Sequence, residues 1–213
     1  EQFSIANLVF EDKLANHSRT LARSISPISK DFALKQLINA QDNDNSSLLI
    51  ALINYQKRVK ADFSALLTKD GETIVSNVME PSSLWPISEI RQAGANLILI
   101  NETPYLTRAV PIRFVESSRR VNAWLVMGIE LQKLINDDLK KVLGFDVTLI
   151  LDQTIKASTY PALSDKIAQE NGNLRPIEQT NGLSEQISFQ ERDYRFYRFI
   201  MNVVGNRPLN VFF

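Results

Sequence analysis

The sequence predicts an α+β protein in which a long N-terminal helix is followed by two modules, each an antiparallel five-stranded sheet with flanking helices. Three observations predict this fold class. The first 60 residues have the hydrophobic spacing of helices, the period changes from about 3.6 to 2 at Ala61, and the order hairpin, short helix, three strands then occurs twice. The predicted regions are a helical region at 1–60, a first module at 61–130 and a second module at 131–213.

The first predicted helix covers residues 2–26, a stretch without glycine or proline. Its apolar and small polar residues are spaced alternately four and three apart, which is the heptad pattern of a helix with one buried stripe. Pro27 is expected to end the helix. The heptad positions are Asn7, Leu14, Leu21 and Ile28 in one column, and Phe3, Phe10, His17 and Ser24 in the other.

Polar residues mark the start of the next two helices. Asp31 is expected to cap a helix over 32–40, because an aspartate side chain accepts hydrogen bonds from the free N–H groups of a first helical turn. The polar stretch 42–46 predicts a turn, after which Ser46 or Ser47 is expected to cap a third helix.

The first module begins with a predicted β-hairpin. Phe63, Ala65 and Leu67 alternate with other positions, and the sequence Lys-Asp-Gly at 69–71 predicts a tight turn into a second strand over 73–78. The remaining expected elements are a short helix at 87–93 and strands at 96–100, 105–114 and 121–129.

The second module repeats this order after a linking helix. That helix is expected over 130–143, with Gly144 as its left-handed cap. Two copies of about 70 to 80 residues are too long and too few for a solenoid, so we interpret them as one repeated module. The expected elements are strands at 146–151 and 154–158, a short helix at 163–169, and strands at 185–189, 192–201 and 209–213.

The composition excludes several classes of function. The chain has no cysteine, which removes disulfides, thiol nucleophiles, zinc–thiolate sites and iron–sulfur clusters. It has 24 basic and 24 acidic residues, and no predicted region departs from neutrality by more than two charges, so no region has the basic excess that nucleic-acid binding needs. Residues 192–199 interleave arginines with aromatics, but neither face of that strand is purely basic, and a half-exposed strand is the preferred interpretation.

Catalytic and metal-binding signatures are also missing from the sequence. His17 is the single histidine and lies in the heptad pattern, where a buried or interfacial structural role fits better than general base catalysis. The segment 42–53 begins like a calcium loop but has Ser47 and Ile53 where glycine and glutamate are needed. The seven glycines form no phosphate-binding loop. We therefore predict no catalytic residue, metal site or cofactor, with an enzyme that uses converging carboxylates as a competing hypothesis.

Basic and aromatic residues of the first module indicate a ligand site. Arg108 falls in an otherwise apolar row of its strand, where an unpaired guanidinium is costly, so it needs an acidic partner. A structural ion pair and a bound carboxylate or phosphate both meet this need. The predicted ligand-binding residues are Arg108, Tyr105, Arg113, Trp85 and Trp124, although a core position in its strand is the preferred interpretation of Trp124.

The heptad pattern of the first helix leaves two alternatives open. One is packing of the stripe against strands of the same chain. The other is a parallel homodimer, with an interface formed by Phe3, Phe10, Leu14, His17, Leu21 and Ile28.

Three sequence blocks resemble the double CACHE (dCACHE) sensor domains of bacterial transmembrane receptors. The likeness is strongest to those in front of diguanylate cyclase and phosphodiesterase (GGDEF/EAL) output domains. The blocks are LARSISPISKDFALKQ at 21–36, RVKADF at 58–63 leading into KDG at 69–71, and VNAWLVMGI at 121–129. They cover most of residues 20–130, while the second module matches in pattern more than in motif.

The resemblance implies two PAS-like (CACHE) modules in an extracytoplasmic, periplasmic domain held between two transmembrane helices. The chain starts at Glu1 and ends on an apolar run, and its longest apolar runs fall far short of the ~18 residues that span a bilayer, so we expect the anchors to lie outside this fragment. The arginine, tryptophan and aspartate set with which amino-acid-binding members hold their ligand has no evident counterpart here.

These observations predict a non-enzymatic sensor domain of a transmembrane signalling protein that makes or degrades cyclic-di-GMP. A small molecule, with an anion as one candidate, is expected to bind in the membrane-distal first module, and the long helix is expected to carry the signal. The alternative is a ligand-free dimerisation, interaction or spacer domain.

Overall fold

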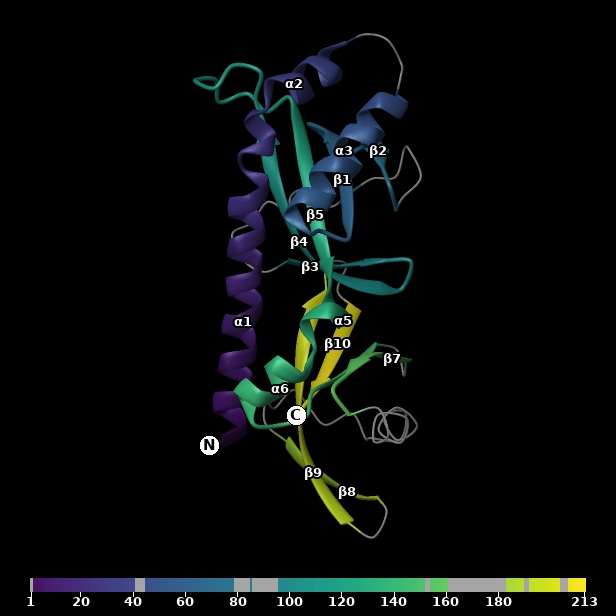
Figure 1. Cartoon of the computed structure of the whole chain (residues 1–213). Helices are drawn as coiled ribbons and strands as arrows, with labels where there is room; N and C mark the ends of the chain where they lie inside the picture. The colour runs from purple at the N-terminus through teal and green to yellow at the C-terminus, as the bar shows by residue number, and fades with distance from the viewer. Residues whose placement is uncertain are drawn as a thin grey trace. The chain divides into compact units, whose positions relative to one another are not determined.

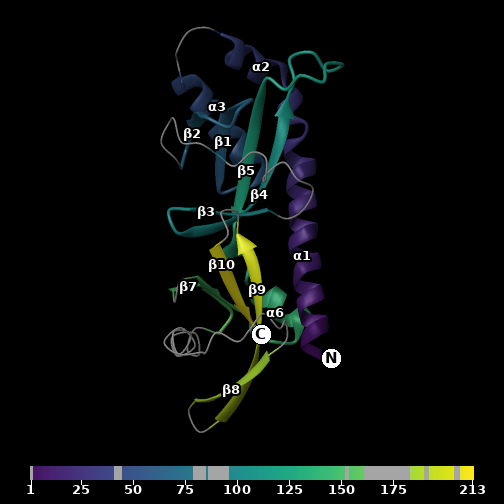
Figure 2. The ribbon, with the colours of Figure 1, turned by 180° about the vertical axis from the view of Figure 1, so that it is seen from behind.

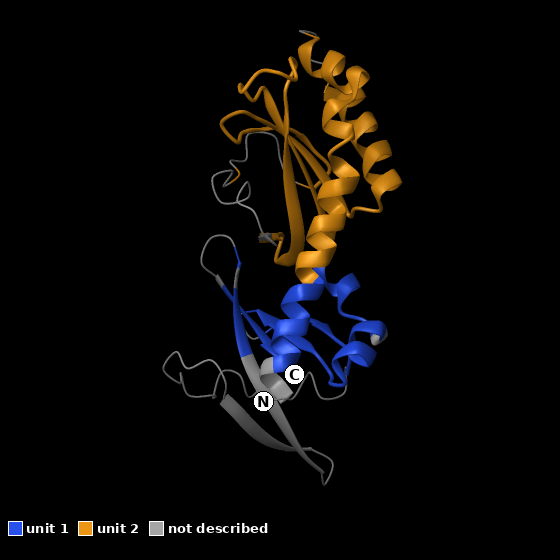
Figure 3. Ribbon diagram, turned by 90° about the vertical axis from the view of Figure 1, so that its left-hand side faces the viewer, with its two compact units in different colours: residues 1–13, 131–213 blue, residues 14–130 orange. Residues whose placement is uncertain are grey.

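The computed structural model describes residues 2–40, 45–78, 85, 96–151, 154–160, 183–189, 192–203 and 207–213. They form two compact units (Figure 3): unit 2 comprises 14–130, and unit 1 comprises 1–13 together with 131–213. The division after residue 130 coincides with the predicted division between the modules. The predicted helical region 1–60 is shared between the units, since most of it belongs to the unit that contains the first sheet.

Helix α1 (Gln2–Ile25) is the long helix predicted from the sequence, and it contributes residues to both units. It ends two residues before Pro27, in a turn followed by the 3₁₀ helix η1 (Ile28–Lys30). Figure 1 shows α1 in purple. Its buried residues are Ala6, Phe10, Leu14, Ser18, Leu21 and Ile25.

The buried stripe of α1 corrects the heptad assignment at two of its polar positions, Asn7 and His17. Ala6 and Ser18 are buried, whereas Asn7 is half-buried and His17 is exposed. The physical reason is that a straight helix has 3.6 residues per turn, so a buried stripe drifts away from a strict seven-residue repeat. His17 is therefore not buried within the chain, while the expected interfacial role stays a prediction.

Helix α2 (Phe32–Asn39) begins where the sequence predicts, and Asp31 caps it as expected: the Asp31 carboxylate accepts a hydrogen bond from the Leu34 N–H at 3.1 Å. The cap satisfies one of the N–H groups that a first helical turn leaves without a partner.

Helix α3 (Asn45–Val59) is the third predicted helix. Ser46 and Ser47 lie within its first turn because the helix begins at Asn45, so the expectation that either serine caps it was wrong. Most of the turn predicted at 42–46 lies outside the described residues.

Unit 2 contains a five-stranded antiparallel sheet with the order β2-β1-β5-β4-β3. All strands predicted for the first module are present, within about two residues at each end, while the short helix predicted at 87–93 lies outside the described residues. The strands are β1 (Phe63–Thr68), β2 (Thr73–Ser76), β3 (Asn96–Ile100), β4 (Thr103–Ile112) and β5 (Ala123–Glu130).

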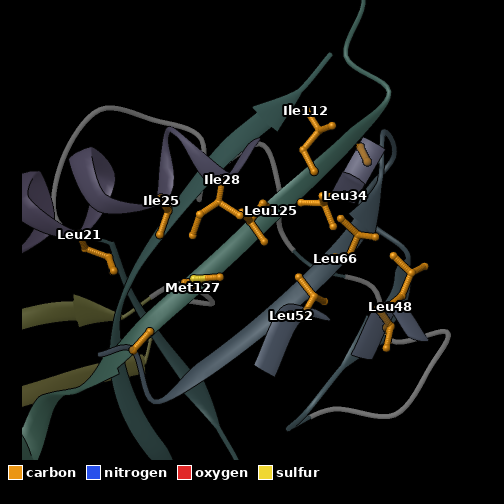
Figure 4. Packing of buried hydrophobic residues seen from close by; sticks show 13 residues of the cluster. Leu21, Ile25, Ile28, Leu34, Leu48, Leu52, Leu66, Ile112, Leu125 and Met127 are labelled. Carbon is orange, nitrogen blue, oxygen red and sulfur yellow. The ribbon is translucent and has the colours of Figure 1, made fainter. Parts of the chain in front are cut away.

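Helices cover one face of this sheet (Figure 4), which we call the helix-covered face. Side chains from α1, η1, α2 and α3 form one apolar cluster with side chains of the strands. Burying a leucine or isoleucine stabilises the fold by about 1.5–3 kcal/mol, so the cluster fixes residues 21–25 of α1 to the sheet. Its members are Leu21, Ile25, Ile28, Leu34, Leu48, Leu52, Ala61, Leu66, Val75, Ile112, Ala123, Leu125 and Met127.

Unit 1 contains a second five-stranded antiparallel sheet, ordered β7-β6-β10-β9-β8, so position for position its order repeats that of the first sheet. This confirms the repeated module. Strands β8 and β9 form a long hairpin, best seen in Figure 2. The strands are β6 (Thr148–Leu151), β7 (Thr154–Ser158), β8 (Leu183–Phe189), β9 (Arg192–Val203) and β10 (Arg207–Phe212).

The single linking helix predicted over 130–143 is two helices, α5 (Leu131–Leu134) and α6 (Asp137–Leu143). Asn136 breaks it, because its side-chain oxygen accepts a hydrogen bond from the Leu139 N–H at 3.1 Å and caps α6. Gly144 ends α6 with φ of 74°, the left-handed cap that the sequence predicts. The short helix predicted at 163–169 lies outside the described residues.

Candidate ligand-binding site

Three aromatic residues pack together on the face of the first sheet opposite the helix-covered face. Phe63, the first residue of β1, is fully buried at their centre. Its ring centroid lies 5.0 Å from that of Tyr105, in an edge-on arrangement, and 5.8 Å from that of Trp85. We call Phe63, Trp85 and Tyr105 the aromatic cluster. Such pairs contribute about 0.5–1.5 kcal/mol beyond the apolar area that they bury.

The aromatic cluster depends on a glycine in the neighbouring strand. Gly128 of β5 is paired with Phe63 of β1 on one side and with the buried Thr107 of β4 on the other. A Cβ atom on Gly128 would lie 2.1 Å from Cε1 of Phe63, a distance that two carbon atoms cannot adopt. Only glycine therefore leaves room for the Phe63 ring above the centre of the sheet.

Trp85 is fixed by hydrogen bonds to the β1–β2 hairpin. Its backbone N–H donates to the carbonyl oxygen of Gly71 at 2.9 Å, and its indole N–H donates to the hydroxyl of Thr73 at 3.0 Å. Trp85 is 4% exposed, and these two bonds satisfy both of its donors within the protein. These bonds tie the cluster to the tight turn that the sequence predicts.

Trp124 lies on the same face of the sheet but four residues along β5 from Gly128. It is paired with Leu67 and Pro111, and its indole N–H donates to the carbonyl oxygen of Lys69 at 3.4 Å. The residue is buried. Trp124 therefore occupies a core position of its strand, one of the two roles considered for it from the sequence.

The two predicted arginines lie away from the aromatic cluster. Arg108 is paired with Met127, whose side chain belongs to the apolar cluster on the helix-covered face, so the sheet separates Arg108 from Tyr105. Arg113 follows β4 and lines a cavity with Lys30 and Lys35. Of the five residues predicted to bind a ligand, the structure thus brings together Trp85 and Tyr105. Whether any of the five binds a ligand stays a prediction.

Phe63, Gly128 and the two lysines were not predicted as site residues. Phe63 and Gly128 are 65 residues apart in the chain, and only the register between β1 and β5 brings them into contact. A glycine within a strand pattern is the one sequence signal that points to such a close approach. Lys30 and Lys35 could not be recognised as site residues from the sequence, because exposed helices commonly carry lysines.

Most of the predicted dimer-interface residues are buried within the chain itself. Phe10, Leu14, Leu21 and Ile28 are at most 8% exposed. The Phe10 ring packs edge-on against Phe213, with a centroid distance of 5.8 Å. Packing within the chain therefore accounts for these four, while His17 is exposed and the side chain of Phe3 lies outside the described residues. Dimerisation stays a prediction.

Tyr55 of α3 has a displaced pKa. Burial is the main reason that the pKa of Tyr55 is raised, and its hydrogen bond to the Asp31 carboxylate raises it further, while Arg58 opposes both effects. The Arg58 guanidinium lies 5.8 Å from the centre of the Tyr55 ring. These contacts stabilise the helical layer and are not part of the aromatic cluster.

No group of three or more histidine, aspartate and glutamate side chains in the described part of the chain is placed to hold a metal ion. No described helix is both long and apolar enough to span a membrane.

Comparison with known proteins shows the fold. No protein-family model and no curated protein matches the sequence. The chain is similar to the periplasmic domain of Vibrio cholerae LuxQ, with 13% identity over 100% of this chain and 98% of that one and a TM-score of 0.58. It is also similar to the sensor domain of the V. cholerae histidine kinase DctB, with 16% identity, 99% and 91% coverage and a TM-score of 0.51.

A third solved structure is the ligand-binding domain of the Pseudomonas aeruginosa PAO1 amino acid chemoreceptor PctB in complex with L-Arg. It shares 11% identity with this chain over 95% of this chain and 86% of that one, and at a TM-score of 0.44 the likeness says nothing about a ligand here. The two stronger matches confirm the predicted fold class, a long N-terminal helix with two antiparallel sheets.

Proposed function

We propose that the chain is the periplasmic ligand-sensing domain of a transmembrane signalling protein. The observation that carries the proposal is the fold: 99–100% of the chain aligns with the DctB sensor domain and the LuxQ periplasmic domain. The sequence blocks that resemble dCACHE domains support the same conclusion independently. The domain itself is proposed to be non-catalytic.

Unit 2, which contains the first module, is the proposed ligand-binding unit. Tyr105 is half-buried and offers aromatic surface next to the buried Trp85 and Thr73, and small-molecule sites combine apolar walls with a few polar groups in this way. Arg108, Arg113 and Trp124 remain proposed ligand residues, although the sheet register places Arg108 on the other face.

Helix α1 is the proposed carrier of the signal. Leu21 and Ile25 are buried against the first sheet, and packed interfaces of this kind move between discrete arrangements instead of deforming continuously. A ligand that binds one arrangement more tightly than the other shifts the equilibrium between the two helix positions. The size of the shift is set by the difference in binding free energy.

The wider context of the domain is part of the same proposal. The dCACHE resemblance supports a parent protein anchored by transmembrane helices on both sides, with unit 2 distal to the membrane, a parallel homodimer and a cyclic-di-GMP output domain. Measuring cyclic-di-GMP turnover by the parent protein, with and without a ligand of this domain, tests the output. A parent without such an output domain would refute this part and leave the sensor proposal intact.

A thermal-shift screen of amino acids, organic acids, purines and polyamines tests the sensor proposal. A compound that binds only the native state raises the melting temperature, by an amount that corresponds to about 2.7 kcal/mol at a hundred times its Kd. We expect Tyr105→Ala to abolish the shift and Tyr160→Ala, a tyrosine of unit 1, to preserve it. No stabilising compound in the whole screen would favour the alternative, a ligand-free interaction or spacer domain.

A further inference from the structure

Unit 2 has a second candidate site at the end of α1. A cavity of about 270 Å³ lies among η1, α2 and the C-terminal end of β4 with the loop that follows it. Lys30 and Lys35 line it from the helical side, and Arg113 lines it from the strand side. Its volume, just below the usual range for ligand pockets, suits a small molecule.

The lining of the cavity is cationic. Lys30, Lys35 and Arg113 contribute three positive charges against the single carboxylate of Glu116, which leaves a net charge of +2. Within the described residues, none of these four side chains forms an ion pair. Among the described residues, the net charge of +2 is therefore not neutralised by ion pairs.

Arg113 carries the most specific signal. Its Nε atom is buried and has no hydrogen-bond partner in the described part of the chain. A buried donor without a partner is costly, and more so on a charged group, so such a group is a natural hydrogen-bond donor for a bound molecule. The guanidinium is a planar fork that matches a carboxylate or phosphate with two parallel hydrogen bonds.

We propose that this cavity binds a small multivalent anion, an organic polycarboxylate or a phosphate. Arg113 binds the anion through its guanidinium, and the two lysines neutralise the remaining charge. The Ser26 hydroxyl adds a neutral donor, while Val110 and Pro111 form an apolar wall. The adjacent Ser29 hydroxyl holds the turn in place by donating to the Ser26 carbonyl oxygen at 2.9 Å.

The anion site is separate from the aromatic cluster and goes beyond the proposed function. Ser26 directly follows α1, Lys35 belongs to α2, and Arg113 directly follows β4. A bound anion therefore links the end of the proposed signalling helix to the first sheet. An anion at this site is expected to stabilise that junction whether or not a second ligand occupies unit 2.

Isothermal titration calorimetry of the 213-residue chain tests the proposal, with citrate and inorganic phosphate titrated separately at constant ionic strength. We expect single-site binding of at least one of them, and the two titrations distinguish a carboxylate site from a phosphate site. Arg113→Ala should weaken binding at least about tenfold, because the lost bonds join charged groups. The matched control is Arg119→Ala, which removes an equal charge from the same loop outside the cavity and should weaken binding less than about twofold.

Glu116→Gln provides a test that does not depend on the stability of the Arg113 variant. Removing the one carboxylate of the lining should tighten binding about two- to fivefold, since like charges repel the anion. The proposal is overturned if neither anion binds at up to about 10 mM, if Arg113→Ala and Arg119→Ala weaken binding equally, or if Glu116→Gln leaves the affinity unchanged. Each of these results leaves the Tyr105-dependent shift untouched, so failure here is distinguishable from failure of the proposed function.

Discussion

Gly128 has no side chain, and this leaves space above the centre of the first sheet. Phe63 fills that space and brings Tyr105 and Trp85 into contact with it. Sequence reasoning found Tyr105 and Trp85 as candidates from their residue type. It missed Phe63 and Gly128 because only the register of two strands distant in the chain brings them together.

Gly128→Ala is expected to lower the free energy of unfolding by about 1–3 kcal/mol, because the new methyl group forces the Phe63 ring from its position. Urea denaturation measures the change. In a Phe63→Leu background, which removes Cε1 and Cζ of the colliding ring, the same substitution should cost clearly less. Equal costs in the two backgrounds would show that Phe63 is not the obstacle.

Asp31 joins two helices through one carboxylate. It caps α2 through the Leu34 N–H and accepts the hydrogen bond of the Tyr55 hydroxyl from α3. Asp31→Ala should therefore destabilise the chain by about 1–2 kcal/mol in chemical denaturation, while Asp31→Asn, an equally good cap, should keep most of the stability. Equal losses in both variants would show that the cap contributes little.

The raised pKa of Tyr55 predicts a loss of stability at alkaline pH. The folded chain holds the Tyr55 proton more tightly than the unfolded chain, whose tyrosine pKa is about 10. The resulting stabilisation is complete below pH ~10 and is lost as the pH rises through the folded-state pKa. Tyr55→Phe should flatten the fall of unfolding free energy above pH ~10. If the slope of unfolding free energy against pH is unchanged in this variant, other groups cause the loss of stability at alkaline pH.

Among the elements, α1 shows both the strength and the limit of sequence periodicity. The length of the helix and its end before Pro27 were predicted, because both follow from local residue properties. The choice between a strict heptad and a straight helix depends on what the helix packs against. Ser18 is buried and the neighbouring His17 is exposed, so the structure favours the straight helix over the strict heptad.

Two alanine substitutions in α1 test this packing. Leu14→Ala should cost about 2–5 kcal/mol of unfolding free energy, because Leu14 is 2% exposed and its removal leaves a cavity. His17→Ala, three residues along, should change stability by less than about 0.5 kcal/mol. Thermal or urea unfolding gives both values. A large effect at His17 in a concentration-dependent transition would instead indicate the parallel dimer.

The linking segment after the first sheet shows a second limit. Gly144 ends α6 because glycine readily adopts the left-handed backbone conformation of a helix cap, and the sequence predicted this end. The break between α5 and α6 was missed because Asn136 is tolerated within a helix as well as at its start, and the hydrogen bond to Leu139 decides between the two.

At the scale of the whole molecule, the two sheets follow one strand order, β2-β1-β5-β4-β3 and β7-β6-β10-β9-β8. The sequence predicted this repetition because each module has the same succession of local signals: a hairpin turn, then three strand-like runs. Local signals do not report which residues face a common cavity. The grouping of Lys30, Lys35 and Arg113 therefore emerged only from the fold.

Hydrogen–deuterium exchange of the chain, with and without the compound that most raises its melting temperature, tests the central claim most directly. The claim is that unit 2 binds a small ligand and passes the change to α1. We predict slower exchange in β1, β4 and β5 and in residues 14–25 of α1, where the helix packs on the first sheet. Slower exchange confined to residues 131–213 would contradict the claim.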